Sequence, residues 1–215
     1  MKTVKTLAVQ TEVEKFGFLR KLALELGASE AAFIPANQVV VENRVVLKCR
    51  LGCKNYGKTM ACPPYSPTAE EFRKIVSEYD HALFMKFNSS AEADIDLRRN
   101  LGKSEDDLPE NLKDKAQEFW SKWKDDKKKL LTVVLDLEKE AAQQGYPLAV
   151  GFVSGACEIC EKCNLEEGIC LHPDMARFSE EAVGVNVHAT ATNAGIEMTV
   201  PFGKNLASYA LLLID

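Results

Sequence analysis

The sequence lacks any long apolar run, and this absence bears first on the cellular location of the protein. Residues 1–10 contain no apolar segment long enough for the central part of a secretory signal peptide. No stretch approaches the roughly 20 consecutive apolar residues that a membrane-spanning helix needs. We therefore expect a cytoplasmic protein that has no membrane partner.

Several motifs of catalysis and binding are also missing. The sequence contains no glycine-rich phosphate loop, no Ser/His/Asp arrangement and no H-E-x-x-H motif. Nucleotide hydrolysis, serine hydrolase chemistry and zinc peptidase activity are therefore unsupported. The net charge is −5 and no basic stripe stands out, which argues against nucleic acid as a partner.

The composition is that of a chain with a real hydrophobic core. The 215 residues, 46% of them hydrophobic, fit one large domain, and no repeat, low-complexity tract or interdomain linker is evident. Residues 88–107 are polar, and apolar residues then recur at helical spacing. We expect a single domain over residues 1–215, with a helical insertion at about residues 88–145.

Short apolar runs alternate with segments of helical periodicity. The runs that we interpret as buried strands are residues 31–34, 81–87, 148–153 and 209–213. This alternation predicts an α/β or α+β fold, namely a layered sheet of about four core strands with helices packed on it and cysteine-rich loops at one end. Residues 39–41 and 45–47 are β-prone, although a helix is possible there. The strand order cannot be deduced from these patterns.

Local signals also predict where helices begin and end. Capping boxes at residues 11–14 and 66–71 each open a helix. The insertion predicts a helix of about 30 residues, which is long for a globular domain, so we expect a break near Asp125 and Asp126. We interpret Trp120 and Trp123 as core residues of the insertion, and residues 127–129 as a solvated lysine cluster.

A further helix is expected after the last cysteine. Residues 172–174 have the sequence His-Pro-Asp, which opens helices, and residues 187–194 suggest a second short helix. The first helix would place Arg177 and Glu181 four residues apart, so an ordinary i,i+4 ion pair is predicted.

Cysteine is the residue that the sequence has in quantity. Four of the seven thiols follow a C-x2-C-x2-C-x6-C pattern: Cys157, Cys160, Cys163 and Cys170. Three thiols spaced two residues apart can surround one face of a compact inorganic cluster, and a fourth thiol from the following loop completes the shell. The spacing therefore favours a [4Fe–4S] cluster over its alternatives, a zinc site or unligated thiols.

The other three thiols, Cys49, Cys53 and Cys62, form a C-x3-C-x8-C pattern. A proline follows Cys62, as it does in some cluster loops. Neighbouring basic residues would offset thiolate charge, or lower the thiol pKa values if no metal is present. We predict a second metal or cluster site here. Seven thiols cannot fill the eight positions of two clusters, so one iron would stay open, and we interpret His172 as a helix-opening residue rather than the missing ligand.

Two motifs taken together resemble the DUF2284 family of predicted metal-binding proteins. The first runs from Cys49 through Cys62-Pro-Pro to Thr68, and the second from Ser154 through Cys170-x-His-Pro to Gly184. The similarity covers roughly residues 10–213 and includes all seven cysteines. It implies a single metal-binding domain with a metal held by cysteines, expected to be iron–sulfur, and it names no substrate.

These observations leave three functional hypotheses. The first is an iron–sulfur protein with one and possibly two [4Fe–4S] clusters, engaged in electron transfer or in redox or sulfur chemistry. Its redox partner protein or small-molecule substrate is unidentified, and whether it is an enzyme is open. The second is a zinc-stabilised binding or regulatory module without catalysis. The third is a metal-free thiol redox sensor in which Cys62 reacts.

Overall fold

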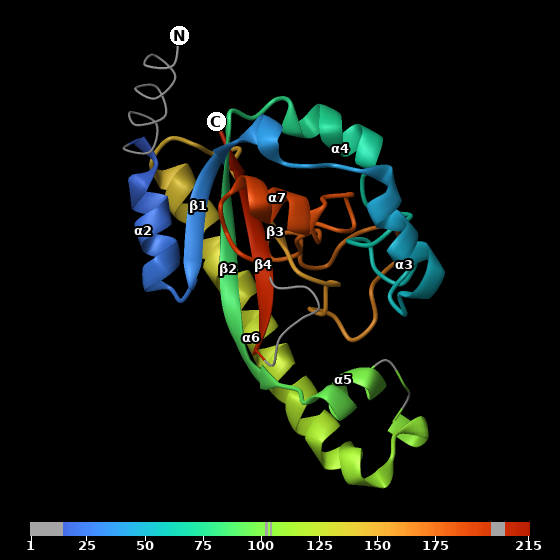
Figure 1. Ribbon diagram of the computed structural model, residues 1–215. Coiled ribbons are helices and arrows are strands. Elements are labelled where there is room, and N and C mark those ends of the chain that lie inside the picture. Colours follow the sequence, from blue (N-terminus) through green and yellow to red (C-terminus); the bar gives the residue numbers. More distant parts are fainter. Residues whose placement is uncertain (1–14, 102, 104, 199–204) are drawn as a thin grey trace.

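The computed structural model describes residues 15–101, 103, 105–198 and 205–215 (Figure 1). The first predicted capping box, at residues 11–14, lies outside these residues. The second is confirmed at the start of α4 (Ala69–Val76), where the Glu71 amide donates to the Thr68 hydroxyl at 3.2 Å and the Thr68 amide donates to the Glu71 carboxylate at 2.8 Å.

Four antiparallel strands form one sheet in the order β1-β2-β4-β3. The strands are β1 (Glu30–Pro35), β2 (His81–Glu92), β3 (Val150–Val153) and β4 (Asn205–Ile214). All four predicted strand segments are therefore confirmed, within a mixed fold of helices packed on a sheet. The order joins the last strand to the second and third, a pairing between distant segments that local patterns do not encode.

The two central strands contain continuous apolar runs, residues 82–85 of β2 and 209–214 of β4, because both faces of the sheet are covered there. In β2, Leu83 and Met85 face one hydrophobic cluster, whereas Ala82 and Phe84 face the other. The register pairs Leu83 with Leu212 across the two strands. A strand buried on both sides gains from an apolar residue at every position, so the polar alternation of a half-exposed strand is absent.

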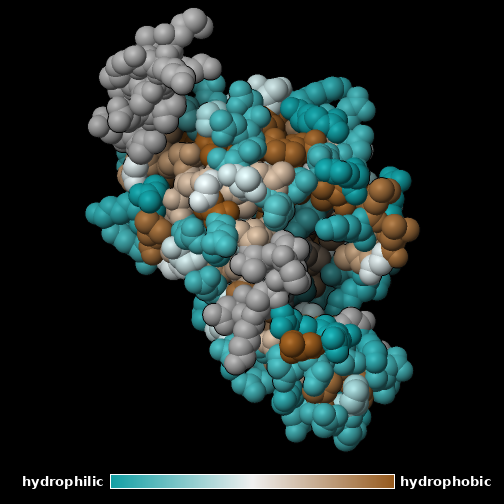
Figure 2. Space-filling model, in the orientation of Figure 1, coloured by the Kyte–Doolittle hydropathy of each residue, from teal (hydrophilic) through white to brown (hydrophobic). Residues whose placement is uncertain are grey.

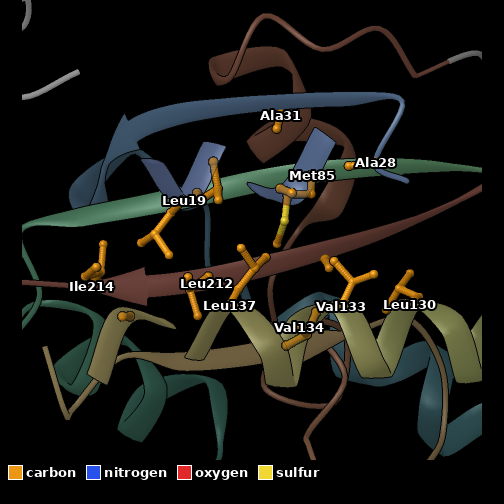
Figure 3. Packing of buried hydrophobic residues seen from close by; sticks show 14 of the residues in the cluster. Leu19, Ala28, Ala31, Met85, Leu130, Val133, Val134, Leu137, Leu212 and Ile214 are labelled. Carbon is orange, nitrogen blue, oxygen red and sulfur yellow. The ribbon is translucent and has the colours of Figure 1, made fainter. Parts of the chain in front are cut away.

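Helices α2 (Gly17–Glu25) and α6 (Glu110–Gln143) cover one face of the sheet. Figure 3 shows Val133, Val134 and Leu137 of α6 directed at the side chains of the two central strands. Leu137 and Leu212 are fully buried, and burial of each such leucine contributes roughly 1.5–3 kcal/mol. This face ties α6 firmly to the sheet.

The opposite face carries α4 and α7 (Val187–Asn193), whose buried side chains include Phe72 and Ala191. In Figure 1 these helices and α3 (Val46–Gly52) lie toward the viewer and to the right of the strands. Of the β-prone residues, 45–47 take the helical alternative, because they end the 3-10 turn Asn43–Val45 and begin α3. Residues 39–41 follow the 3-10 turn Ala36–Gln38 and belong to no helix. Val41 alone makes an isolated bridge, to Val185.

The predicted break in the long helix is wrong, because α6 continues through Asp125 and Asp126 for 34 residues. Asp126 instead anchors the helix to β2, since its carboxylate accepts hydrogen bonds of 2.7 Å from the Ser89 hydroxyl and the Ser90 amide. These serines lie where the β2 register shifts. None of the described helices, α6 included, is both long enough and apolar enough to cross a membrane.

The insertion forms a small hydrophobic cluster of its own beyond the sheet. Helix α5 (Ile95–Asn100) packs Leu97 against Ala116 and Phe119 in the N-terminal half of α6. Trp123 packs on this cluster as predicted, but Trp120 is 44% exposed and is therefore not a core residue. Figure 2 shows this end of the molecule covered mostly by hydrophilic residues. The extent of the domain and its insertion remains a prediction.

Gly151 of β3 offers a test of the contact between the edge strand and α6. A Cβ atom at this position would overlap Val134 Cγ1 and lie 3.0 Å from Glu138 Oε1. We expect Gly151→Ala to lower the free energy of unfolding by about 1–3 kcal/mol, because the packed helix must move. Denaturant unfolding measures this. The control Gly17→Ala, where a Cβ meets no atom within 4 Å, should be neutral or stabilising by up to about 1 kcal/mol; equal losses in both would refute the tight contact.

Candidate metal centre

The second cysteine motif lies in the long loop that leaves the end of β3. The helix predicted after residue 174 is wrong, since residues 172–184 form turns and bridges. The Val153 amide donates to the Phe178 carbonyl at 3.0 Å, and Val153 and Ser179 form a parallel bridge. The Phe178 carbonyl, which a helix would use for its own hydrogen bonds, is thus taken by the edge strand, and the loop is held beside β3.

The structure brings the four thiols of this motif together around one small cavity. The cavity is lined by Cys157, Cys160, Cys163 and Cys170. Burial raises the pKa of Cys157, and the nearby thiols of Cys170, Cys160 and Cys163 raise it further. His172 also lines this cavity. The sequence predicts a helix-opening role for His172, but no helix follows this residue, and it lies among the thiols.

The first cysteine motif contributes to the same cavity through its backbone. Thr59, Met60 and Ala61 lie on the cavity wall, and the Met60 amide points at Cys163 Sγ from 3.5 Å. An amide directed at a sulfur stabilises negative charge there, which is how proteins adjust the properties of metal-bound thiolates. The two motifs are 103 residues apart in sequence at this contact.

The three remaining thiols, Cys49, Cys53 and Cys62, line a second cavity together with Glu181. Burial raises the pKa of Cys49, and the charges of Cys53, Glu181 and Cys62 add to the rise. Burial likewise raises the pKa of Cys62, against the opposing effects of Thr59 and Lys127. The prediction that basic neighbours lower the thiol pKa values is therefore wrong for these two cysteines, because desolvation outweighs the cations.

The two cavities are neighbours. Residues 59–61 line the first and Cys62 with Pro63 lines the second, so one short segment separates them. The charges of Cys62 and Cys163 also influence each other across this boundary. All seven cysteines, each a free thiol, therefore belong to one candidate centre with two compartments.

Lys127 of α6 contacts the cysteine loop that follows β3. Its ammonium donates to the Ala156 carbonyl at 3.2 Å and lies 3.5 Å from the Glu158 carboxylate. Only 15% of the side chain is exposed, so the interpretation of residues 127–129 as wholly solvated is wrong for this lysine. Its positive charge lowers the pKa of Cys62 and of Glu181. No local pattern distinguishes Lys127 from the two lysines that follow it.

A larger cavity, of about 370 Å³, opens beside the cysteine loop. Cys157 and Ile159 of the loop form one wall, and Leu131 and Leu135 of α6 contribute apolar surface opposite. Lys127 and three further cationic residues also border it, namely Lys124, Lys128 and Arg177. Pockets of this size and mixed character accommodate small organic molecules.

Arg177 fixes the loop to α6 rather than to its own segment. Its guanidinium makes a two-pronged ion pair with Glu138, with Nε 2.7 Å from Oε1 and Nη2 on Oε2. The same Oε1 accepts a hydrogen bond of 2.6 Å from the Gly151 amide. The predicted i,i+4 pair with Glu181 is therefore wrong, because without a helix the two side chains take different directions and Glu181 lines the cysteine cavity.

Glu180 is an unexpected feature of this loop. It is fully buried, and neither carboxyl oxygen has a hydrogen-bond partner among the described residues. Desolvation, reinforced by the charge of Glu181, holds the pKa of Glu180 well above its usual range. Burial therefore favours the protonated, neutral form of the Glu180 carboxyl group.

Within the described residues, no three or more His, Cys, Asp or Glu side chains are arranged so that they could hold a single metal ion directly. The thiols instead surround the two cavities described above. Side chains of this kind can rotate about their Cα–Cβ bonds between staggered positions when a metal binds.

Comparison with known protein families shows to which family the chain belongs. The family model described as predicted metal-binding protein (DUF2284) matches residues 32–214. This chain belongs to the DUF2284 family. The match includes every cysteine and both cavities of the DUF2284 fold described here. Comparisons with curated proteins and with solved structures gave no match.

Removal of the Arg177 guanidinium tests the role of its ion pair in this DUF2284 protein. We expect Arg177→Met to lower the free energy of unfolding by about 3 kcal/mol, because Glu138 is left charged, unpaired and only 13% exposed. Chemical denaturation of the metal-free protein measures the loss. The double variant with Glu138→Met should recover part of it, and an additive second loss would contradict a coupled pair.

The neutral Glu180 predicts a specific pH dependence of stability. The pKa of Glu180 is higher in the folded than in the unfolded protein. Its contribution to stability is therefore greatest below about pH 4.3 and falls as the pH rises toward the folded-state pKa. The Glu180→Gln side chain cannot ionise, so the loss of stability with rising pH that Glu180 causes should be absent in this variant. Thermal unfolding from about pH 5 to about pH 8 checks the slope. Asp136→Asn, an exposed change on α6, should keep the wild-type slope, and an unchanged slope in Glu180→Gln would refute the assignment.

Proposed function

We propose that this DUF2284 protein is a cytoplasmic iron–sulfur protein. A [4Fe–4S] cluster would be held by Cys157, Cys160, Cys163 and Cys170, and a second metal or cluster by Cys49, Cys53 and Cys62. The observation that carries the proposal is that the four closely spaced thiols line one cavity. The family itself indicates metal binding without naming the metal.

The donor set fits an iron–sulfur cluster on chemical grounds. Iron–sulfur clusters are ligated by four cysteine thiolates, and these four thiols lie around a space rather than meeting at one point. A body of several iron and sulfide atoms requires such an arrangement. Burial raises the pKa of Cys157, so without metal this thiol keeps its proton, and metal binding would release it.

The surrounding residues would adjust the chemistry of a bound cluster. When bound, a [4Fe–4S] cluster supplies one-electron transfer. The Met60 amide directed at Cys163 and the largely buried ammonium of Lys127, which acts on Cys62, both stabilise negative charge on sulfur. Because hydrogen bonds and net charge set cluster potentials, these two groups would make reduction easier.

The adjacency of the two compartments supports a redox role. Cys62 and Cys163 lie close enough for their charges to interact, so electrons could pass between the two sites without crossing the protein core. The cavity beside Cys157 would admit a small-molecule substrate, and its lysine and arginine border would favour an anion. A redox partner protein is the alternative recipient of electrons. The negative net charge disfavours nucleic acid.

Metal analysis of anaerobically prepared protein tests this proposal. We expect iron and acid-labile sulfide in equal amounts, with visible absorption from sulfur-to-iron charge transfer. Cys160→Ala should remove the iron of the first compartment and leave that of the second, whereas Cys53→Ala should do the reverse. Far-ultraviolet circular dichroism should stay unchanged in both variants, since the apolar core lies elsewhere.

Two results would overturn the proposal. Stoichiometric zinc in colourless protein, lost together with the fold on chelation, would identify the zinc-stabilised module instead. Absence of iron, sulfide and zinc even after anaerobic reconstitution would favour a metal-free thiol sensor. The properties of Cys62 argue against the thiol-sensor hypothesis, because this residue is only 6% exposed and has a raised pKa. Reactive thiols are accessible and have lowered pKa values.

A further inference from the structure

The second compartment contains a carboxylate among its three thiols. Cys49, Cys53 and Cys62 line it together with Glu181, which comes from the loop after β3. Glu181 lies close enough to Cys49 for its charge to raise the pKa of that thiol. Three sulfur donors and one oxygen donor therefore share a single space, although they come from segments about 120–130 residues apart.

The backbone explains why Glu181 faces this cavity. Ser179 forms a bridge with Val153 of β3, and its carbonyl accepts a hydrogen bond of 3.1 Å from the Ala182 amide. Residues 179–182 therefore form a turn that is held beside β3. Ser179 and Glu181 both line the cavity, whereas the intervening Glu180 is directed into the protein interior. The Ser179 side chain lies close enough to the Glu181 carboxyl group to oppose the rise of its pKa.

His172 is the other candidate for the eighth ligand, but it lies in the first compartment. His172 lines the compartment that already has four thiols, so it does not face Cys49, Cys53 and Cys62. Among the described residues that line the second compartment, Glu181 has the only carboxylate, and no histidine is present. Carboxylate oxygen is an accepted ligand for both iron and zinc. Lys48 and Lys127 offset its charge.

We propose that Glu181 is the fourth protein ligand of the metal or cluster bound by Cys49, Cys53 and Cys62. This inference rests on the proposed function and changes one part of it, because the eighth ligand position is then filled by oxygen. A carboxylate is a harder donor than thiolate and holds iron less tightly, so an incoming ligand would displace Glu181 before any cysteine. An anionic or thiol-bearing small molecule would bind at this iron.

The test compares three anaerobically reconstituted proteins: wild type, Glu181→Ala and Glu181→Cys. Mild oxidation with ferricyanide takes one electron from a [4Fe–4S] cluster, and one ferrous ion leaves to give a [3Fe–4S] cluster. We expect Glu181→Ala to lose this iron about tenfold faster than wild type, since the ion has lost a protein ligand. Glu181→Cys should lose it more slowly than wild type. Iron release and the electron paramagnetic resonance signal of [3Fe–4S] are the readouts.

The control is Glu161→Ala, which removes an exposed glutamate from the other cysteine motif and should behave as wild type. A variant with Cys160→Ala leaves only the second compartment loaded, so the released iron can be assigned. Thermal unfolding of each metal-free variant checks that the fold is kept.

The outcomes separate the two proposals. One outcome is that the wild-type protein holds clusters and that Glu181→Ala and Glu181→Cys release iron at the wild-type rate. Glu181 is then not a ligand, and the iron–sulfur assignment stands. If the second compartment holds zinc, Glu181→Ala should weaken zinc binding about tenfold or more, and an unchanged affinity again overturns the ligand role. If wild type binds neither metal in this compartment, both the second site and its carboxylate ligand are refuted.

Discussion

The packing of α6 on the sheet is the constraint on which the rest of this structure depends. The helix buries an apolar row against β2 and β4, and the same rigid element carries the polar side chains that hold the cysteine loop. Glu138 binds Arg177 and the Gly151 amide, and Lys127 binds the Ala156 carbonyl. A break in α6 would separate these groups from the core that positions them. The uninterrupted helix thus connects hydrophobic burial to the geometry of the candidate centre.

Charge is balanced in an unusual way around the thiols. Burial raises the pKa of three cysteines and of two adjacent glutamates, so in the absence of a metal these acids tend to keep their protons. A bound cation reverses that preference, because it replaces the protons and stabilises thiolates and carboxylate alike. Lys127 favours the ionised forms of both Cys62 and Glu181, which line the second compartment. Binding of a metal by these groups would therefore release protons.

Local patterns predicted the elements of the fold better than their connections. The strand segments were found because β2 and β4 carry continuous apolar runs, and the helix at Thr68 because its capping box is self-contained. Two errors about helices share one cause, which is a contact with a distant segment. The local pattern predicts a helix break near Asp126, but this residue binds Ser89 and Ser90 of β2. The pattern after residue 174 predicts a helix, but this segment pairs with Val153 of β3. Tertiary hydrogen bonds outweighed the local preferences in both places.

The sequence by itself determined the cysteine spacings, the membership of the four-thiol group and the layered sheet, because each is encoded within a short stretch or in short apolar runs that alternate with helical segments. Only the tertiary structure decided that the second cysteine group shares a cavity with Glu181, that His172 lies with the other group, and that Arg177 binds α6. These side chains come together because the loop after β3 is pinned between the edge strand and the long helix. No rule of spacing along the chain can express that contact, since it arises from the packing of whole elements.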